Sequence, residues 1–505
     1  MVLFKKSKPR QEEVLDVGGK ARLNSKDFKQ ALPGIRVISE EDPDYERSRQ
    51  IQNTRFNYKP FYIVKCQNKD DVVKTIKLCQ RENKSVRICS GGHQHEGMCS
   101  ADNVVVIDLS CMREISVCKD SCTAWIEPGS QLQYVYQELE ADDFTLPGGG
   151  GDTVNIGGLV QGGGWGMLAR AGGLTCDSLQ EVKLVTATGK PIRVTQDNQY
   201  QDLFWGIKGG GGGNFGVIIQ YKFQLMKHQD AQLISISYTS DKDKILITKL
   251  LECYLNELPI FDDNITSFAR VSHYNAQKQE SGLTLTMRFN CFGRDNIIYN
   301  KVRDFFEKLS DLKQKAGSHH QLEWENLDTQ QEIRDADLLI NSSVALPHKV
   351  SSAFPKGNIT KLSQKIIDFV YKQKNFNKAA TYLSIHSLGG KIKKISADSS
   401  SFFYRDKEFL LQFQAWWQQP NDEQSGDYIN WVRNFRQELD NAGCIEGAFI
   451  NFPDQTIVEP SGDEKADKIK LLKYYYGDNL DRLREIKAKY DPHNFFSFGM
   501  SIPPK

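Results

Sequence analysis

The glycines of this chain gather in one part of the sequence. The chain has 39 glycines, and many of them lie in two dense segments, residues 146–166 and 202–216. Because glycine has no Cβ, it lets a backbone take turns that other residues avoid and pass close to a ligand. The cluster therefore predicts a main chain that lies along an extended bound molecule.

Length and charge narrow the remaining classes of protein. A chain of 505 residues is expected to form two or three domains, or one large domain with inserts. Its 65 basic and 64 acidic residues leave a formal net charge of +1, which gives no electrostatic reason to expect a nucleic acid or an anionic membrane as partner. No run of about 18 apolar residues occurs, so a membrane-spanning helix is not expected.

The first residues and the cysteines bear on location. MVLFKKSKPRQEEV is charged within five residues and lacks the apolar region of a secretory signal. The 11 cysteines form no C-x-x-C pair, so we expect reduced, packed thiols and no bound metal. These features favour an intracellular, cytoplasmic protein, although a precursor that had lost its leader would have the same pattern.

Composition and periodicity divide the chain into four stretches. Residues 1–56 are polar, and we interpret them as an N-terminal arm that would suit docking to a larger protein assembly. Residues 57–228 alternate short β-rich runs with helical patterns, which indicates an α/β layer. Residues 229–455 carry longer apolar–polar alternations between amphipathic stretches, which predicts an antiparallel sheet backed by helices. Residues 456–505 end in a helix and an aromatic loop. The fold class is therefore α+β.

Several individual elements follow from these patterns. Strands are expected at 61–66, 85–89, 104–109, 283–292 and 379–388, and helices at 70–83, 300–313 and 427–441.

Each motif has an ordinary interpretation when it is taken alone. His93 follows Gly91 and Gly92 after a predicted strand, where a lone histidine is usually a solvated turn residue. His93 and His95 form an H-x-H pair, but a third metal ligand at suitable spacing is missing. The later GGGGNFG has the spacing of a dinucleotide-binding loop without the acidic residue that should follow about 20 positions on.

Taken in order, the motifs resemble those of a known family. SVRICSGGHQHEGM (85–98), DLFWGIKGGGGGNFG (202–216) and YDPHNFFSFGMSIPP (490–504) are similar to motifs of the berberine-bridge-enzyme-like flavoprotein oxidases, in the vanillyl-alcohol oxidase superfamily. The resemblance covers roughly residues 57–505. It implies a PCMH-type FAD-binding domain at 57–228, a substrate domain at 229–455 and a berberine-like segment at 456–505 that returns to the FAD-binding domain.

The resemblance also implies a cofactor, FAD, and a set of residues that bind it. The family's motif histidine, which bonds through a ring nitrogen to the 8α-methyl group of the flavin, falls on His93. The other residues expected to bind the cofactor are Ser90, Gly91, Gly92, Gly97, Thr153, Val154, Gly157, Gly158, Gly163, Gly216, Val217 and Asn494.

The middle segment departs from the family pattern. Gly151 stands where bicovalent members have a second flavin-bonding cysteine, so a single covalent bond through His93 is expected. Leu159 replaces a histidine near the pyrimidine edge of the flavin. Val154 falls on the family's oxygen-gating position, and a small β-branched residue there favours an oxidase that uses O₂.

A second departure concerns the catalytic base. Many members abstract the substrate proton with a tyrosine from a Y-x-N-Y strand, and here Phe449 and Phe452 take those places. Phenylalanine has no ionisable oxygen, so another group must act or the activity is lost. By residue type alone, the candidates are His386, Tyr404 and Asp454, which could equally be packing or surface residues.

Two functions therefore remain open at this point. The first is an FAD-dependent oxidoreductase that oxidises an alcohol, a sugar or another oxygenated small molecule by hydride transfer to flavin N5, with O₂ as acceptor. The second is a catalytically inactive flavin-fold protein that serves as a structural or interaction component of a larger assembly. The lost tyrosine hydroxyls and the polar arm motivate this alternative.

Overall fold

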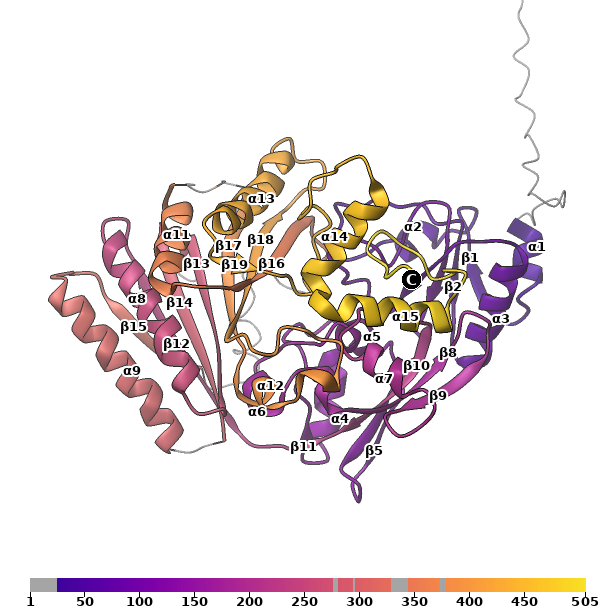
Figure 1. The fold of residues 1–505 in the computed structure, drawn as a ribbon, viewed down its shortest axis with the longest axis horizontal. Helices are drawn as coiled ribbons and strands as arrows, with labels where there is room; N and C mark the ends of the chain where they lie inside the picture. The colour runs from indigo at the N-terminus through magenta and orange to yellow at the C-terminus, as the bar shows by residue number, and fades with distance from the viewer. Residues whose placement is uncertain (1–24, 276–279, 294–295, 328–343, 373–375, 377) are drawn as a thin grey trace, which may run out of the picture.

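The computed structural model describes residues 25–275, 280–293, 296–327, 344–372, 376 and 378–505. The described chain forms two halves (Figure 1): a half built from the N-terminal part of the chain, and a large sheet with helices. The two C-terminal helices, α14 (Glu464–Tyr476) and α15 (Leu480–Tyr490), return to the first half. No helix among these residues is long and apolar enough to cross a membrane.

The first sheet has the strand order β1-β2-β4-β3. Its strands are β1 (Arg36–Ile38), β2 (Tyr62–Lys65), β3 (Val86–Cys89) and β4 (Val105–Asp108). β2, β4 and β3 are parallel, and the central β4 is buried along its whole length. Helix α3 (Lys69–Arg81) connects β2 to β3, and its first turn is capped by the Asn68 side chain, which accepts from two backbone N–H groups.

The second sheet is antiparallel, in the order β5-β6-β10-β8-β9. Its strands are β5 (Ile115–Cys118), β6 (Thr123–Ile126), β8 (Leu179–Val185), β9 (Pro191–Thr195) and β10 (Val217–Gln224). The connections carry the helices α4 (Leu132–Glu140), α5 (Ile156–Gln161), α6 (Ala169–Gly172) and α7 (Gln201–Ile207), the turn η1 (Thr175–Ser178), and the small pair β7 (Phe144–Thr145) and β11 (Met226–Lys227).

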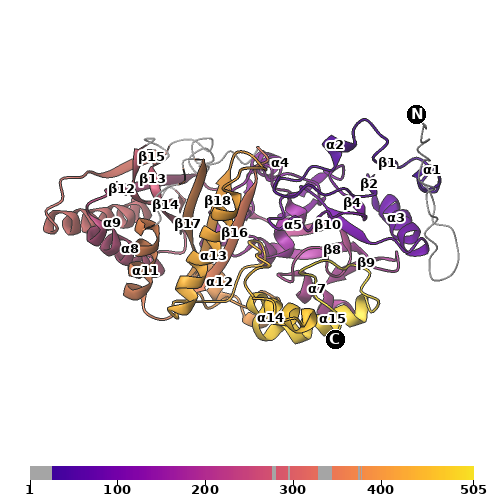
Figure 2. The same ribbon diagram turned by 90° about the horizontal axis from the view of Figure 1, so that it is seen from above.

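The third sheet is antiparallel, in the order β15-β12-β14-β13-β17-β18-β16-β19. Its strands are β12 (Ala231–Thr239), β13 (Ile265–Asn275), β14 (Glu280–Phe292), β15 (Leu322–Leu327), β16 (His348–Pro355), β17 (Ala379–Ser387), β18 (Phe409–Trp417) and β19 (Ile445–Glu446). Helices α8 (Lys244–Glu257), α9 (Asn296–Lys315), α11 (Ile359–Lys372) and α13 (Ser425–Asn441) lie along one face of it (Figure 2). The remaining short elements are η2 (Leu258–Ile260), α12 (Gly390–Lys394), η3 (Ala397–Ser399) and η4 (Gly477–Asn479).

The two faces of this third sheet differ in chemistry. Successive side chains of a strand point to opposite faces. One set, including Leu383, Leu411 and Phe413, joins the hydrophobic core under the helices. The alternate set, including His386 and Gln412, is polar, and the His386 ring lies against Trp165, a residue of the first half. The sheet therefore presents a polar face to the other half of the chain.

Part of the expected N-terminal arm belongs to the fold. Residues 1–24 lie outside the described residues, but 25–56 form α1 (Ser25–Gln30), β1 and α2 (Tyr45–Ser48). The Phe28 ring is fully buried and stacks on Tyr62 with centroids 4.1 Å apart. Sequence periodicity did not reveal this, because the few apolar residues of the segment are buried by docking on the first sheet.

Phe28→Ala tests this packing. The substitution should lower the free energy of unfolding by about 3 kcal/mol, because it removes a buried aromatic ring and leaves a cavity. Denaturant titration measures the change. The control is Phe61→Ala, because the Phe61 side chain is 41% exposed and its loss should cost about 0.5 kcal/mol or less. Equal effects of the two substitutions would contradict the docked position of α1.

Candidate functional site

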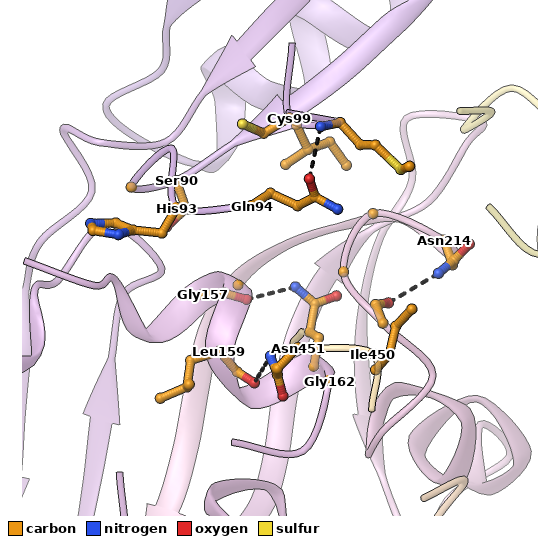
Figure 3. A pocket seen from close by; sticks show the side chains of 18 of the residues that line it. Ser90, His93, Gln94, Cys99, Gly157, Leu159, Gly162, Asn214, Ile450 and Asn451 are labelled. Carbon is orange, nitrogen blue, oxygen red and sulfur yellow. Dashed lines mark hydrogen bonds between the residues drawn. The ribbon is translucent and has the colours of Figure 1, made fainter. Parts of the chain in front are cut away.

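A cavity lies where the glycine-rich segments meet the C-terminal tail. Its wall is formed by stretches that lie far apart in the sequence (Figure 3). These stretches fall within residues 86–99, 154–162, 211–221, 450–453 and 496–500. The three motifs that carried the family resemblance therefore come together around one space.

Hydrogen bonds hold the C-terminal tail against the glycine segments. Asn214 accepts from the Lys487 ammonium at 2.7 Å through its carbonyl oxygen, and from Ile502 N–H at 2.8 Å through Oδ1. Tyr476 OH donates to Gly210 O at 2.8 Å. The Arg87 guanidinium donates to Ser497 O at 2.6 Å. The tail is thus a wall of the cavity that is fastened at both ends.

The cavity wall suits a large polar ligand such as FAD. Gly158 lines the cavity, and a Cβ added there would meet no atom within 4 Å, so a side chain would occupy open space. Asn155 donates through Nδ2 to Gly129 O at 3.0 Å, but its buried Oδ1 has no hydrogen-bond partner among the described residues. A buried acceptor without a partner is costly, so it is available to a ligand donor. The residues of the cavity wall therefore fit FAD.

His93 lies in the loop after β3, beside Ser90, and is one of the residues that line the cavity (Figure 3). Its Nε2 lies 3.0 Å from Thr153 O and 3.2 Å from Thr153 Oγ1. Because a carbonyl oxygen only accepts, Nε2 carries the ring proton and Nδ1 keeps its lone pair. Burial lowers the pKa of His93 to about 4, so the ring is neutral at neutral pH. Nδ1, which keeps its lone pair, is therefore the ring nitrogen that can act as a nucleophile.

Most of the predicted cofactor-binding residues line the cavity. They are Ser90, Gly91, Gly92, His93, Val154, Gly157, Gly158 and Gly216.

Five of the predicted cofactor-binding residues are not on the cavity wall. Thr153 contacts His93, and Val217 turns a buried side chain into the first sheet's core between two residues that do line the cavity. Gly97 faces the Phe56 ring, and Gly163 faces Leu174 and Phe449. Asn494 lies in the tail turn at φ +53°. A motif contains residues that shape the turns as well as residues that reach the ligand.

The middle segment, which departs from the family pattern, contributes three residues that have different positions in the structure. Val154 and Leu159 line the cavity, and Asn451 Nδ2 donates to Leu159 O at 3.1 Å (Figure 3). Gly151 does not line it, and a Cβ there would lie 2.9 Å from Val154 Cγ2.

The structure does not bring Tyr404 or Asp454 to the cavity wall. Tyr404 OH donates to Tyr474 O at 2.6 Å, and its ring stacks on Phe354. Asp454 accepts from the buried Lys349 ammonium at 2.6 Å, and the Lys349 charge helps to lower the pKa of Asp454 to about 2. Both side chains are engaged in packing or in an ion pair, so neither is a base at this site.

His386 also lies off the cavity wall. It is buried on the polar face of the third sheet, where its Nε2–H donates to Gln412 Oε1 at 2.9 Å. Burial lowers its pKa to about 4. The histidine that does line the cavity besides His93 is His95, which sequence reasoning weighed only as half of a metal pair. Among the described residues, no three metal-ligating side chains come together.

Comparison with known proteins gives the chain its class. Residues 60–195 match the FAD binding domain family, and residues 448–503 match the berberine and berberine like family. An uncharacterized FAD-linked oxidoreductase of Bacillus subtilis, YgaK, is 29% identical over 93% of this chain and 97% of its own length. Berberine bridge enzyme-like C-1 of Nicotiana tabacum is 26% identical over 90% of this chain and 87% of its own. The chain is thus an FAD-linked oxidoreductase.

Solved structures agree in fold. Chitooligosaccharide oxidase superimposes with a TM-score of 0.80 at 23% identity, covering 95% of this chain and 98% of that one. Berberine bridge enzyme from Eschscholzia californica gives 0.80 at 22% identity, covering 95% and 99%. Together with the two matched domains, these findings confirm the resemblance: the chain carries an FAD binding domain and a berberine-like segment, and it has the fold of berberine bridge enzyme.

The buried neutral histidines predict a dependence of stability on pH. His386 is neutral in the folded state with a pKa of about 4, against an ordinary value of 6.5. Protons therefore bind the unfolded chain first, so stability is full above pH 6.5 and falls as the pH drops toward 4. His386→Gln should remove up to one proton from the uptake that accompanies unfolding. The slope of the unfolding free energy against pH should therefore fall by up to about 1.4 kcal/mol per pH unit. Denaturant titrations between pH 4 and 7.5 measure it, and an unchanged slope would contradict the assignment.

Proposed function

We propose that the chain oxidises an alcohol carbon of a sugar or another oxygenated small molecule and passes the electrons to O₂. The observation that supports this most strongly is the cavity itself. It joins a wall of glycine main chain and His93 to residues that touch the polar face of the third sheet. Two fold relatives are named for the oxidation of oligosaccharides: chitooligosaccharide oxidase, and xylooligosaccharide oxidase in complex with xylobiose.

The cavity has two tasks in this proposal: to hold the cofactor and to orient the substrate. The backbone of Ser90–Gly92 and Gly157–Gly158 would hold FAD, with Asn155 Oδ1 as an acceptor for it, and His93 Nδ1 would carry the single covalent bond. FAD supplies an acceptor for the hydride of a C–H bond. The protein must orient the alcohol carbon toward that acceptor and take up the hydroxyl proton.

The alternative of an inactive assembly component gains no support from the fold. Residues 25–56, the described part of the supposed docking arm, are packed against the first sheet. A location inside the cell stays a prediction.

The covalent bond is directly testable. Acid-denatured protein should keep flavin fluorescence on the polypeptide, and His93→Ala should lose it, because the variant has no Nδ1 nucleophile. A denaturing gel viewed under ultraviolet light shows the difference. The matched control is His228→Gln, since His228 lies outside the cavity. Covalent flavin in the His93→Ala protein would show that another residue forms the bond.

The gating position offers a separate test of O₂ as acceptor. Val154 lines the cavity, so Val154→Leu adds a methylene to the wall that O₂ must approach. Reoxidation of the reduced protein by O₂ should slow about tenfold or more, a change of about 1.4 kcal/mol in the barrier. Stopped-flow absorbance at the flavin band measures the rate. Equal rates in the two proteins would remove Val154 from the path of O₂.

A further inference from the structure

His95 and His348 form a hydrogen-bonded pair at the edge of the cavity. His95 lies in the loop after β3 and lines the cavity, while His348 is the first residue of β16 in the third sheet. His95 Nδ1 is 2.9 Å from His348 Nε2, and the two rings meet edge-on. The pair thus joins the first half of the chain to the third sheet at the cavity.

The hydrogen bonds determine which ring nitrogens carry protons. His348 Nδ1 lies 2.9 Å from Leu346 O, and a carbonyl oxygen only accepts, so Nδ1 is protonated. A neutral His348 then offers the lone pair of Nε2, and His95 must donate to it from Nδ1. This leaves His95 with an unprotonated Nε2, which has no hydrogen-bond partner among the described residues.

Burial keeps both rings in this neutral state. It lowers the pKa of His95 to about 3 and the pKa of His348 well below its ordinary range. The charged groups around the pair act in the same direction: Lys349 on His95, and Arg55 on His348. Glu96 is committed to an ion pair with Lys349 at 2.6 Å. His95 therefore rests as a free base.

Neighbouring side chains hold the pair rigidly. Asn53 Nδ2 donates to His95 O at 2.6 Å and to His348 O at 3.0 Å, and Asn53 Oδ1 accepts from His348 N–H at 3.1 Å. The Trp416 ring stacks on His348 with centroids 3.9 Å apart. A base that is oriented by a second group, itself fixed, is a recurring arrangement in general-base catalysis.

The pair also stands beside the missing tyrosine hydroxyl. Of the two phenylalanines in the family's tyrosine positions, Phe452 lines the cavity and Phe449 does not. The His95 ring centroid is 6.0 Å from the Phe452 ring. We propose that His95 is the catalytic base of this chain, and that His348 positions it. This rests on the proposed alcohol oxidation.

The proposed step conserves atoms and electrons. The hydroxyl proton of the alcohol would move to His95 Nε2, and FAD held in the cavity would supply the acceptor for the hydride of the C–H bond. The alcohol becomes a carbonyl compound. Charge on the protonated His95 is stabilised through its Nδ1–H bond to His348.

The ring protonation can be tested without a substrate. In ¹⁵N-histidine-labelled holoprotein, long-range ¹H–¹⁵N spectra should show His95 with protonated Nδ1 and unprotonated Nε2 from pH 5 to 9. His95→Gln assigns the signals. His348→Leu should shift them, because it removes the acceptor, whereas His348→Gln should shift them less, because its amide oxygen can still accept. A His95 ring that carries protons on both nitrogens, or a neutral ring with its single proton on Nε2, would overturn the proposal.

The kinetic test uses anaerobic flavin reduction by a panel of sugars and simple alcohols, including xylobiose and chitobiose. His95→Gln should slow the reduction by about 100-fold or more at unchanged flavin content. His348→Leu should slow it less, with His348→Gln closer to wild type. His228→Gln is the control and should match wild type. Adding Phe452→Tyr to His95→Gln should restore part of the rate.

The outcomes separate the two proposals. If no panel member reduces the wild-type flavin, the proposed function fails, and the role of His95 falls with it. If the wild type is reduced and His95→Gln is equally fast, only the His95 proposal fails.

Discussion

A buried polar network between the loop after β3 and the start of β16 determines the geometry of this site. Lys349 is fully buried and pairs with both Glu96 and Asp454 at 2.6 Å. Removing one partner of such a pair leaves an uncompensated buried charge, which typically costs about 3–5 kcal/mol. The adjacent Asn53 hydrogen bonds fasten the same two segments. His93 and His95, which lie on that loop, are therefore held at fixed positions relative to the third sheet.

The second constraint is a cavity wall that consists largely of main chain. Gly92 takes a φ of +74° in the turn before His93. At Gly157, an added Cβ would lie 2.7 Å from Pro128 O. A larger residue would therefore push helix α5 away from the segment that contains Pro128. A wall of this kind is specific for the shape of its ligand, and the polar face of the third sheet lies beside it, with the His386 ring 5.6 Å from the ring of the cavity residue Phe452.

Much of the fold was predictable from periodicity. The alternation at 283–292 and 379–388 corresponds to β14 and β17, and the helical patterns at 300–313 and 427–441 to α9 and α13. Local spacing decides these elements. The docking of residues 25–56 was missed because its apolar residues are few, and their burial depends on a sheet formed later in the chain. The same limit applies to His386, Tyr404 and Asp454, because residue type does not reveal which side chains reach a cavity.

The sequence by itself indicated the FAD-binding class, because three motifs resemble those of one flavoprotein family and follow one another in the same order. It also determined that Phe449 and Phe452 lack a hydroxyl. Only the tertiary structure decided which group lies beside that missing hydroxyl. His95 and His348 are 253 residues apart, and the proton positions on their rings depend on a contact between two halves of the molecule. No local pattern encodes a contact of this kind.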